Sequence, residues 1–294
     1  MTTAIRVEDL VKTYHDVTAL EDLSFSIQEN TICGVLGRNG AGKTTAMQII
    51  TGHASPSSGS VDVFGRTPFE DREAMSTMCF VKESQRYPDE FKVKHVLDSA
   101  AALLPHWDAD FAADLLTKFE LPVGRRVKKL SRGMHSMLGI IIGLASRAPV
   151  TLFDEPYLGL DVVARQMFYD ELLADYAKHP RTIVLSTHLV DEIADLLEHV
   201  VLIDGGRVLI DDCAENLRRK AIVATGPTAR IDELAAGGRE LRRETLGTQA
   251  RATVQGDFTD DDLARARAAG VDIEPASLQQ LMIGATGTEG RQRS

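Results

Sequence analysis

Short, nearly continuous apolar runs bounded by turn residues recur along the first two thirds of the chain. Because these runs do not alternate with polar residues, they are typical of strands that are covered on both faces. The predicted strands are Thr31–Leu36, Val150–Phe153, Thr182–Ser186 and Val200–Ile203. The helical patterns that separate them include Val163–Tyr176 and Val190–Leu197. This alternation predicts a parallel α/β sheet.

Two local patterns modify that sheet. Asp204-Gly205-Gly206 separates Val200–Ile203 from the run Arg207–Ile210, which predicts a hairpin and antiparallel strands at the edge. Between residues 88 and 145 apolar residues repeat about every 3.6 positions, at Val93–Leu104 and Phe111–Phe119, each followed by a proline. The sequence therefore predicts a helical insertion within the sheet domain.

The composition changes near Lys220, which is the last lysine; only one aromatic residue, Phe258, follows it. Beyond it a weaker pattern predicts short strands near Ile222 and Ala252 and a helix over Asp260–Ala269. The expected parts are a domain over 1–220 with a helical subdomain at about 84–145, a small α/β appendage over 221–283, and a disordered tail over 284–294.

Composition and charge narrow the functional class. With 44% hydrophobic and 26% charged residues, the 294-residue chain is typical of a soluble globular protein. Its formal charge of −10 argues against a DNA-coating surface, so we expect no nucleic-acid partner. Cys33, Cys79 and Cys213 form no C-x-x-C pair, which favours a reducing compartment without disulfides or zinc.

We expect a cytoplasmic location. The start, Met1–Arg6, has no secretory pattern, and the longest apolar stretch, Met137–Ala145, is well short of the ~20 residues that cross a bilayer. Any role at a membrane would therefore depend on a partner.

One stretch carries a specific phosphate-binding pattern. It follows a predicted strand, opens a predicted helix, and matches G-x-x-x-x-G-K-[ST] with Gly37-Arg38-Asn39-Gly40-Ala41-Gly42-Lys43-Thr44, followed by Thr45. Glycines let successive N–H groups face phosphate oxygens, the helix N-terminus adds its positive end, and Lys43 adds a full charge. Thr44 is placed to bind Mg²⁺ through its hydroxyl. The alternative, a glycine-rich turn that binds nothing, is disfavoured by this context.

Two acidic residues end a predicted strand. The run Val150–Phe153 leads into Asp154 and Glu155, and a strand tip beside a phosphate loop is where a Mg²⁺-holding carboxylate belongs. Asp154 is the metal candidate. Glu155 is the candidate that orients or deprotonates water at the γ-phosphate. The alternative is a charged strand end that enters a turn at Pro156.

The order of these motifs resembles the ATP-binding cassette of ABC transporters over roughly residues 4–220. Leu130–Met134, in which Ser131 is also a predicted helix N-cap, stands where most members carry the signature LSGGQ. Tyr14 stands where the family places an aromatic that stacks on adenine. Leu158–Asp161 resembles the D-loop, and Ser186–His188 resembles the strand end that carries the switch histidine.

This resemblance implies a P-loop NTPase fold with a mainly parallel sheet, antiparallel edge strands and a helical signature subdomain. It implies an ATPase that uses ATP and Mg²⁺, with Glu155 activating water and His188 holding the water and the γ-phosphate. It also implies two cassettes that sandwich two ATPs. Ser131 and the Gly133 backbone, within a signature that includes Arg132 and Met134, would contact ATP on the opposite subunit, and Asp161 would cross the interface.

Three of these residues have simpler explanations. Tyr14 could cover the edge of the sheet, since a lone aromatic after a strand is common. His188 could be an ordinary hydrogen-bonded histidine. Asp161 could be only the N-cap of the helix that begins near Val163.

The chain departs from the family pattern at two places. Glu83 aligns with the glutamine of the Q-loop that senses Mg²⁺, with Gln85 as the rival placement. A carboxylate can ligate Mg²⁺ but offers no amide donor, so turnover or coupling is expected to change. Arg132 and Met134 replace the usual Gly and Gln, and a positive φ at Arg132 would cost ~1 to 2 kcal/mol.

The resemblance implies an ATP-hydrolysing subunit that powers a separate membrane permease, as a homodimer or a heterodimer. The segment from Val271 to Met282 is similar to the closing segment of ATPase subunits of two-component exporters, which favours export over import. Two alternatives remain: a soluble ABC ATPase without a transport role, and a weakly hydrolysing cassette beside a second, different one.

Overall fold

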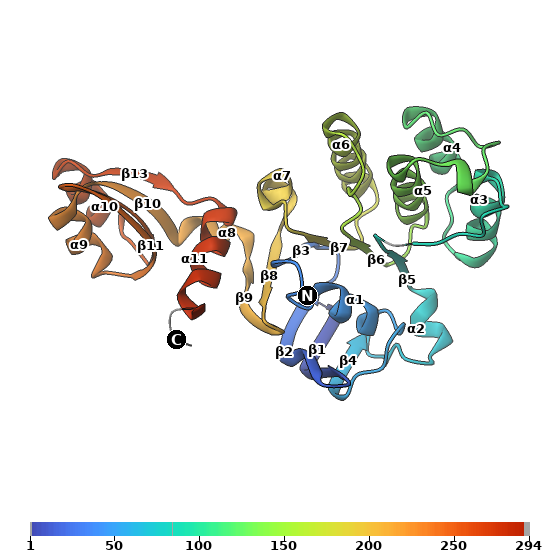
Figure 1. Ribbon diagram of the computed structural model, residues 1–294, viewed down its shortest axis with the longest axis horizontal. Coiled ribbons are helices and arrows are strands. Elements are labelled where there is room, and N and C mark those ends of the chain that lie inside the picture. Colours follow the sequence, from blue (N-terminus) through green and yellow to red (C-terminus); the bar gives the residue numbers. More distant parts are fainter. Residues whose placement is uncertain (1, 84, 291–294) are drawn as a thin grey trace. The chain divides into compact units, whose positions relative to one another are not determined.

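The computed structural model describes residues 2–83 and 85–290, which divide into two compact units (Figure 1). Of these residues, the first unit contains those from 2 to 188 and the segment 203–208; the second contains 189–202 and 209–290. Residues 189–202 and 209–220, expected in the first domain, thus group with the second. Ala214 N–H donates to the Glu198 carbonyl, and the Arg218 guanidinium donates to the Ala194 carbonyl, which ties α8 (Ala214–Arg219) to that unit.

The elements of the first unit follow one another as β1 (Thr3–Tyr14), β2 (Val17–Gln28), β3 (Ile32–Leu36), α1 (Lys43–Ile50), β4 (Ser58–Val63), α2 (Arg72–Ser76), β5 (Met78–Val81), α3 (Val93–Leu103), α4 (Ala109–Lys118), the 3₁₀ turn Val127–Lys129, α5 (Arg132–Ala145), β6 (Val150–Asp154), α6 (Val162–Lys178) and β7 (Thr182–Thr187).

Four parallel strands form the centre of this unit, in the order β5-β6-β7-β3. Every residue of β3, β6 and β7 is buried, as their continuous apolar runs predict. Phe153 and Phe168 meet edge to face at 5.4 Å between ring centroids and pack α6 onto the sheet. The predicted mainly parallel α/β sheet is confirmed.

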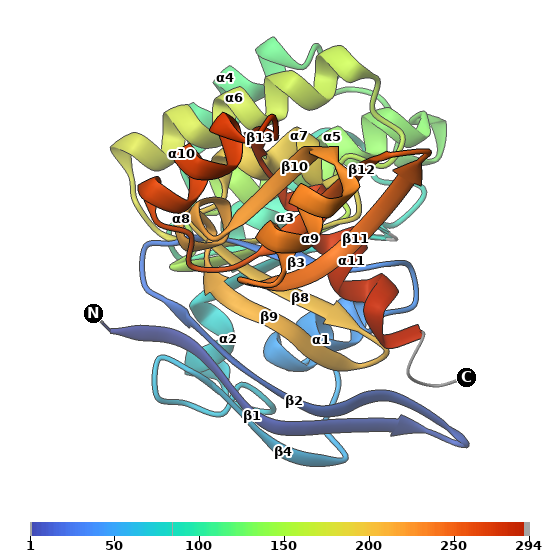
Figure 2. The same ribbon diagram turned by 90° about the vertical axis from the view of Figure 1, so that its left-hand side faces the viewer.

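The first unit also contains a separate antiparallel sheet in the order β2-β1-β4; the long ribbons of β1 and β2 run side by side in Figure 2. The strand prediction missed β1 and β2. Register shifts interrupt their alternation, and Asp9 and Asp22 adopt positive φ angles of 47° and 55° there. An extra residue in a strand moves the following apolar side chains to the other parity, which hides the period of two.

The predicted helical insertion is present as α3, α4 and α5. Val93, Val96 and Leu97 form the buried stripe of α3, and α5 buries a continuous face that includes Leu138 and Ile141. No helix within residues 2–83 and 85–290 is long and apolar enough to span a membrane.

Two strands, β8 (His199–Asp204) and β9 (Arg207–Cys213), are divided between the units, because residues 203–208 belong to the first. The other elements of the second unit are α7 (Val190–Ile193), the 3₁₀ turn Ala194–Leu196, α8, β10 (Ala221–Pro227), α9 (Thr228–Ala235), β11 (Arg239–Leu246), β12 (Gln249–Gln255), α10 (Asp260–Ala268), β13 (Asp272–Pro275) and α11 (Leu278–Gly290). The turn between β8 and β9 is Gly205-Gly206, as predicted, and it belongs to the first unit. Strands β10 to β13 form an antiparallel sheet in the order β11-β12-β10-β13.

This β-α-β-β-α-β succession is a split βαβ arrangement. Ile231 and Leu234 of α9 share one apolar core with Val254 of β12, and α10 adds Leu263 and Ala266. Residues 284–290, predicted to be disordered, belong to α11. Leu278, Leu281 and Ala285 of α11 are buried, so an apolar stripe that the Gly/Thr composition obscured holds the helix. Residues 291–294 lie outside the described residues.

Candidate functional site

The loop that joins β3 to α1 forms the wall of a cavity of about 460 Å³. Gly42 precedes α1 with a φ of 110°, and a Cβ there would lie 2.9 Å from the Ala19 carbonyl oxygen. Only glycine fits this position, so the chain turns sharply and the first N–H groups of α1 face the cavity. A helix N-terminus exposed to a cavity attracts phosphate. The lining residues are Ala19, Asn39, Gly40, Ala41, Gly42, Lys43, Thr44, Thr45, Glu83, Arg132, Glu155, Leu158 and His188.

Lys43 supplies the positive charge of this cavity. The residue is 5% exposed, and its ammonium donates to the carbonyls of Gly37 at 2.7 Å and Arg38 at 3.1 Å. The same nitrogen lies 3.6 Å from Glu155 Oε1. A buried ammonium held by two carbonyls and one carboxylate is ready to exchange those partners for the oxygens of a phosphate.

A pair of hard oxygen donors lies beside the loop. Thr44 donates its hydroxyl hydrogen to Asp154 Oδ2 at 2.7 Å, and Ser186 donates to Asp154 Oδ1 at 2.8 Å. Mg²⁺ prefers one or two protein oxygens together with phosphate oxygens and water. The Thr44 hydroxyl and the Asp154 carboxylate have the chemistry and the proximity for such a site.

Glu155 follows β6 with a φ of 49°, a left-handed conformation that is uncommon for a residue other than glycine. This turn of the backbone directs its carboxylate toward β7, where Oε2 lies 2.7 Å from His188 Nδ1. Oε2 also accepts the hydroxyl hydrogen of Tyr157. Glu155 is therefore held from both sides at the edge of the phosphate cavity.

The start of α5 contributes one residue, Arg132, to the lining of the same cavity. Ser131 caps the helix by accepting from Met134 N–H at 3.2 Å, and Arg132 is the first helical residue. Because Arg132 does not adopt a positive φ, the strain considered from sequence does not arise. Its guanidinium donates to Glu83 Oε1 at 3.1 Å. The two departures from the family pattern thus pair with each other.

Other predicted residues do not line the cavity. The predicted residues outside its lining are Tyr14, Gly37, Arg38, Ser131, Gly133, Met134, Asp154 and Asp161. Asp161 is the N-cap of α6, accepting from Ala164 N–H at 2.8 Å, and the Tyr14 ring lies 4.8 Å from the Lys12 ammonium.

The two candidates for the Q-loop position, Glu83 and Gln85, line different cavities. Glu83 lines the phosphate cavity, whereas Gln85 lines a separate cavity beside β5 and α3. The geometry therefore favours Glu83 as the residue next to the phosphate loop.

Ala19 and Tyr157 belong to the site but were not predicted from the sequence. Ala19 comes from β2, far from the loop in sequence, and no local signal announces it. Tyr157 stands two residues after Glu155 and is buried, so its hydroxyl had to find a partner nearby. Burial and the hydrogen bond to Glu155 raise the pKa of Tyr157 well above that of a free phenol, so the hydroxyl stays protonated.

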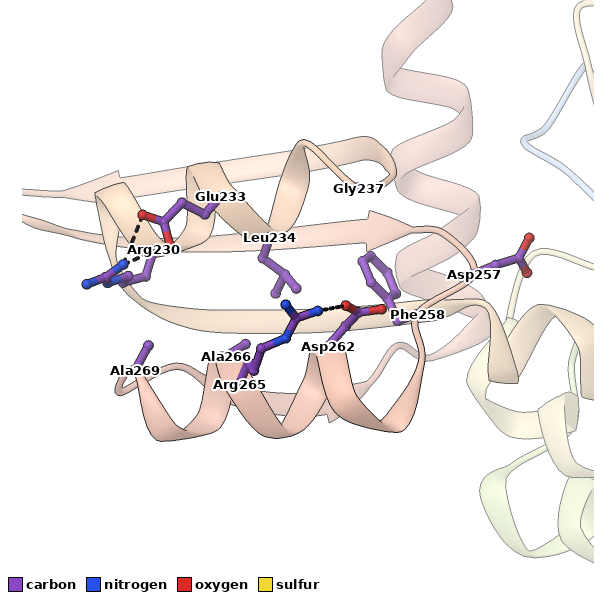
Figure 3. Close-up of a pocket in the computed structure, with 10 residues that line it drawn as sticks. All are labelled: Arg230, Glu233, Leu234, Gly237, Asp257, Phe258, Asp262, Arg265, Ala266 and Ala269. Atoms are coloured by element: carbon purple, nitrogen blue, oxygen red, sulfur yellow. Dashed lines mark hydrogen bonds and ion pairs between the residues drawn. The ribbon is translucent and has the colours of Figure 1, made fainter.

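The second unit has a cleft of its own, of about 440 Å³, between α9 and α10 (Figure 3). Leu234 and Phe258 contribute apolar surface to it. Its arginines pair with acids three residues away on the same helix, Arg230 with Glu233 and Arg265 with Asp262. These residues line the cleft, and each charge is paired within its own helix.

Comparison with known proteins agrees with the geometry. A family model for ABC transporters matches residues 20–158. The uncharacterized ABC transporter ATP-binding protein MJ1023 of Methanocaldococcus jannaschii is 30% identical over 221 residues, which cover 74% of this chain and 80% of that protein. The Nod factor export ATP-binding protein I of Burkholderia thailandensis is 29% identical over 97% of both chains.

A solved structure of an ATP-binding subunit of an ABC transporter superposes with a TM-score of 0.67 at 26% identity. The match covers 74% of this chain and 92% of that one. Together with the phosphate cavity, these similarities lead to one conclusion: the chain belongs to the ABC transporter family and is an ATP-binding subunit that hydrolyses ATP to power transport.

Proposed function

We propose that the chain is one of two cassettes that close around ATP and drive export through a separate membrane permease, on the cytoplasmic face of the cell membrane. The observation that carries the proposal is the convergence of Lys43, Thr44 and Glu155 on one cavity, from two elements that are distant in the sequence. The family assignment supports ATP as the molecule that fills it.

In this proposal ATP is the substrate of the cavity. The backbone of Gly37–Thr45 cradles its phosphates, Lys43 leaves the loop carbonyls for phosphate oxygens, and Tyr14 stacks on the adenine. Thr44 and Asp154 would hold Mg²⁺, with Glu83 as a third oxygen donor. When bound, Mg²⁺ neutralises charge on the phosphates.

Hydrolysis needs a base for the attacking water. Glu155 accepts a proton from that water as its oxygen bonds to the γ-phosphorus, while the bond to ADP breaks and phosphate leaves. His188 holds the water and the γ-phosphate. The hydrogen bond between His188 Nδ1 and Glu155 Oε2 supports this pairing of roles.

The signature residues support a paired arrangement. Ser131, Gly133 and Met134 do not line the phosphate cavity of their own chain, although Arg132 between them does. The start of α5 carries N–H groups suited to phosphate. We propose that Ser131 to Met134 of one chain contact the ATP of the other, and that Asp161 crosses the interface. Homodimer formation is the simplest case.

Export is supported by the Nod factor export relative, which matches nearly the whole chain, appendage included. A permease is proposed to dock around residues 83–97. A cavity of about 480 Å³ there is lined by Gln85, Tyr87 and Val96, and Leu103 at its edge is 80% exposed. Exposed apolar side chains around a cavity favour contact with an apolar segment of a partner.

Two alternative functions have to be distinguished from the proposed one. A soluble ABC ATPase would have no permease, and a weakly hydrolysing cassette would need a second, different one. The pairing of Glu83 with Arg132 favours the second alternative over the first, because both residues depart from the usual pattern at the phosphate cavity.

The experiment is purification of the tagged Glu155→Gln chain from detergent-solubilised membranes of its native host, with ATP and Mg²⁺, followed by mass spectrometry. A stoichiometric polytopic membrane protein is the expected result. A second cassette beside it would identify a heterodimer. Recovery of the soluble chain alone, or with ribosomes or DNA, would overturn the transport proposal. Leu103→Glu serves as a second variant, which should lose the membrane protein and still bind ATP.

A further inference from the structure

Tyr157 is a buried residue beside the phosphate cavity, and the proposed function assigns it no role. It lies between Glu155 and His188, its ring is buried, and its centroid is 5.9 Å from that of the His188 ring. Its hydroxyl oxygen has Glu155, Thr187 and His188 as neighbours. A tyrosine ring fixed by burial is a rigid support for a hydroxyl group.

The hydrogen bonds of this hydroxyl can be assigned by counting. A phenolic oxygen has one hydrogen to donate and two lone pairs. Thr187 donates its hydroxyl hydrogen to this oxygen at 2.8 Å, and His188 donates its backbone N–H at 3.3 Å. Both lone pairs are thereby occupied, so the Tyr157 hydrogen must go to an acceptor. Glu155 Oε2 is the nearest one.

This assignment fixes the tautomer of His188. Nδ1 lies 2.7 Å from Glu155 Oε2 and 3.2 Å from the Tyr157 oxygen, which has no lone pair left. A carboxylate only accepts, so His188 Nδ1 carries the hydrogen and donates it to Glu155. With a single ring hydrogen, the other nitrogen, Nε2, has a lone pair that accepts a hydrogen from a water in the cavity, whereas a contact with a phosphate oxygen requires a second hydrogen, on Nε2.

We infer that Tyr157 is a positioning residue that holds the Glu155 carboxylate and the His188 ring in one orientation. Its hydroxyl anchors Oε2, which leaves Oε1, the oxygen 3.6 Å from Lys43, to face the phosphate site. The inference rests on the proposed roles of Glu155 and His188. It adds that those roles depend on a hydroxyl that does not itself touch the substrate.

The first test compares Tyr157→Phe with the full-length wild-type chain in ATP hydrolysis. Because the variant keeps the ring and removes one oxygen, kcat should fall about tenfold while KM for ATP changes by less than about twofold. Thr187→Val removes a donor to the hydroxyl and should reduce kcat by about two- to threefold. Tyr169→Phe, which alters another buried tyrosine on α6, is the matched control and should leave both constants unchanged.

The second test needs no turnover. In the nucleotide-free chain with ¹⁵N-labelled histidine at pH 8, a long-range ¹H–¹⁵N spectrum reports which ring nitrogen carries the hydrogen, and His188→Gln identifies the signal. The wild type should show His188 with its hydrogen on Nδ1. In Tyr157→Phe the Glu155 carboxylate is no longer held against Nδ1 by the tyrosine hydroxyl, so the ring should sample both tautomers and the two nitrogen shifts should move toward each other.

The outcomes separate the inference from the proposed function. If Glu155→Gln abolishes hydrolysis while Tyr157→Phe matches the wild type in kcat and in the His188 spectrum, the positioning role is wrong and the catalytic assignment stands. A loss in Tyr157→Phe that is equal in kcat and ATP affinity, with an unchanged His188 signal, indicates general damage and also overturns it. If Glu155→Gln hydrolyses ATP normally, the catalytic assignment and the inference both fall.

Discussion

Charged side chains are used differently in the two units of this chain. Around the phosphate loop, Lys43 and Glu155 come from different elements, are 5% and 8% exposed, and lie 3.6 Å apart. In the cleft between α9 and α10, Arg230 pairs with Glu233 three residues away on the same helix, and both are exposed (Figure 3). Burial makes the first kind of interaction strong, whereas water and salt screen the second. Cavities of similar volume therefore differ in what they can do.

The largest difference is expected in hydrolysis. Glu155→Gln removes the proposed base and should lower kcat by about 10²- to 10⁴-fold while ATP binding is retained. Glu233→Gln makes the same chemical change in the other cleft and should leave kcat unchanged. Steady-state hydrolysis and equilibrium binding of a fluorescent ATP analogue check both. Normal hydrolysis by Glu155→Gln would refute the catalytic assignment.

The contrast between buried and exposed charges should also appear in the free energy of unfolding. Asp175 of α6 is 4% exposed and accepts hydrogen bonds from Arg181, at 2.7 Å, and from Arg147. Asp175→Asn leaves two arginines beside a neutral amide and should destabilise the first unit by about 3 to 5 kcal/mol.

Removing one partner of an exposed ion pair should change the stability much less. Glu233→Gln should cost less than about 1 kcal/mol, because exposed ion pairs contribute little. Urea unfolding followed by probes in each unit measures both changes, since one transition cannot describe a two-unit chain. Equal losses for the two variants would mean that burial is not what separates these pairs.

The sequence predicted those elements of the fold that a contiguous run of residues specifies. The strand Val150–Asp154 and the loop from Gly37 to Thr44 were found because a contiguous run of residues specifies each of them. β1 and β2 were missed because the residues that break their alternation, Asp9 and Asp22, sit in bulges that depend on strand pairing. Neighbouring strands decide such features, and the linear pattern does not contain them.

At the phosphate cavity, too, the sequence predicted single residues but not the contacts between them. Glu155 and His188 were named from their motifs, but their 2.7 Å contact and the hydroxyl of Tyr157 between them depend on how β6 and β7 pair. The contact between Glu83 and Arg132 joins residues 49 positions apart, and neither motif announces the other. The roles of these residues stay predictions, which the substitutions test.

A smaller effect is expected at the helix caps. Ser131 caps α5 and Thr259 caps α10, each accepting a backbone N–H through its hydroxyl. Alanine at either position should cost roughly 1 kcal/mol of stability. Only Ser131→Ala should also weaken ATP-dependent pairing, by about tenfold, because it alone is proposed to contact ATP across the interface.

Light scattering after gel filtration, in a Glu155→Gln background with ATP and Mg²⁺, measures that pairing. Nucleotide binding by the monomer should change less than about twofold. If Ser131→Ala weakened pairing and monomer binding equally, the shared-site arrangement would be wrong. A loss of pairing in Thr259→Ala would show that cap removal itself, and not phosphate contact, is responsible.

The smallest effect concerns a pair that combines features of both units. Glu83 and Arg132 are distant in sequence, as in the buried sites, but their side chains are 46% and 69% exposed, as in the appendage. A double-mutant cycle with Glu83→Gln and Arg132→Gln should give a coupling of only about 0.2 to 1 kcal/mol, reduced further at 1 M salt. The cycle Arg230→Gln with Glu233→Gln is the matched comparison. If the exposure of the side chains sets the coupling energy, the two cycles should give the same value. A coupling above about 2 kcal/mol at Glu83 and Arg132 alone would mean that a pair formed by two distant elements is stronger even in contact with water.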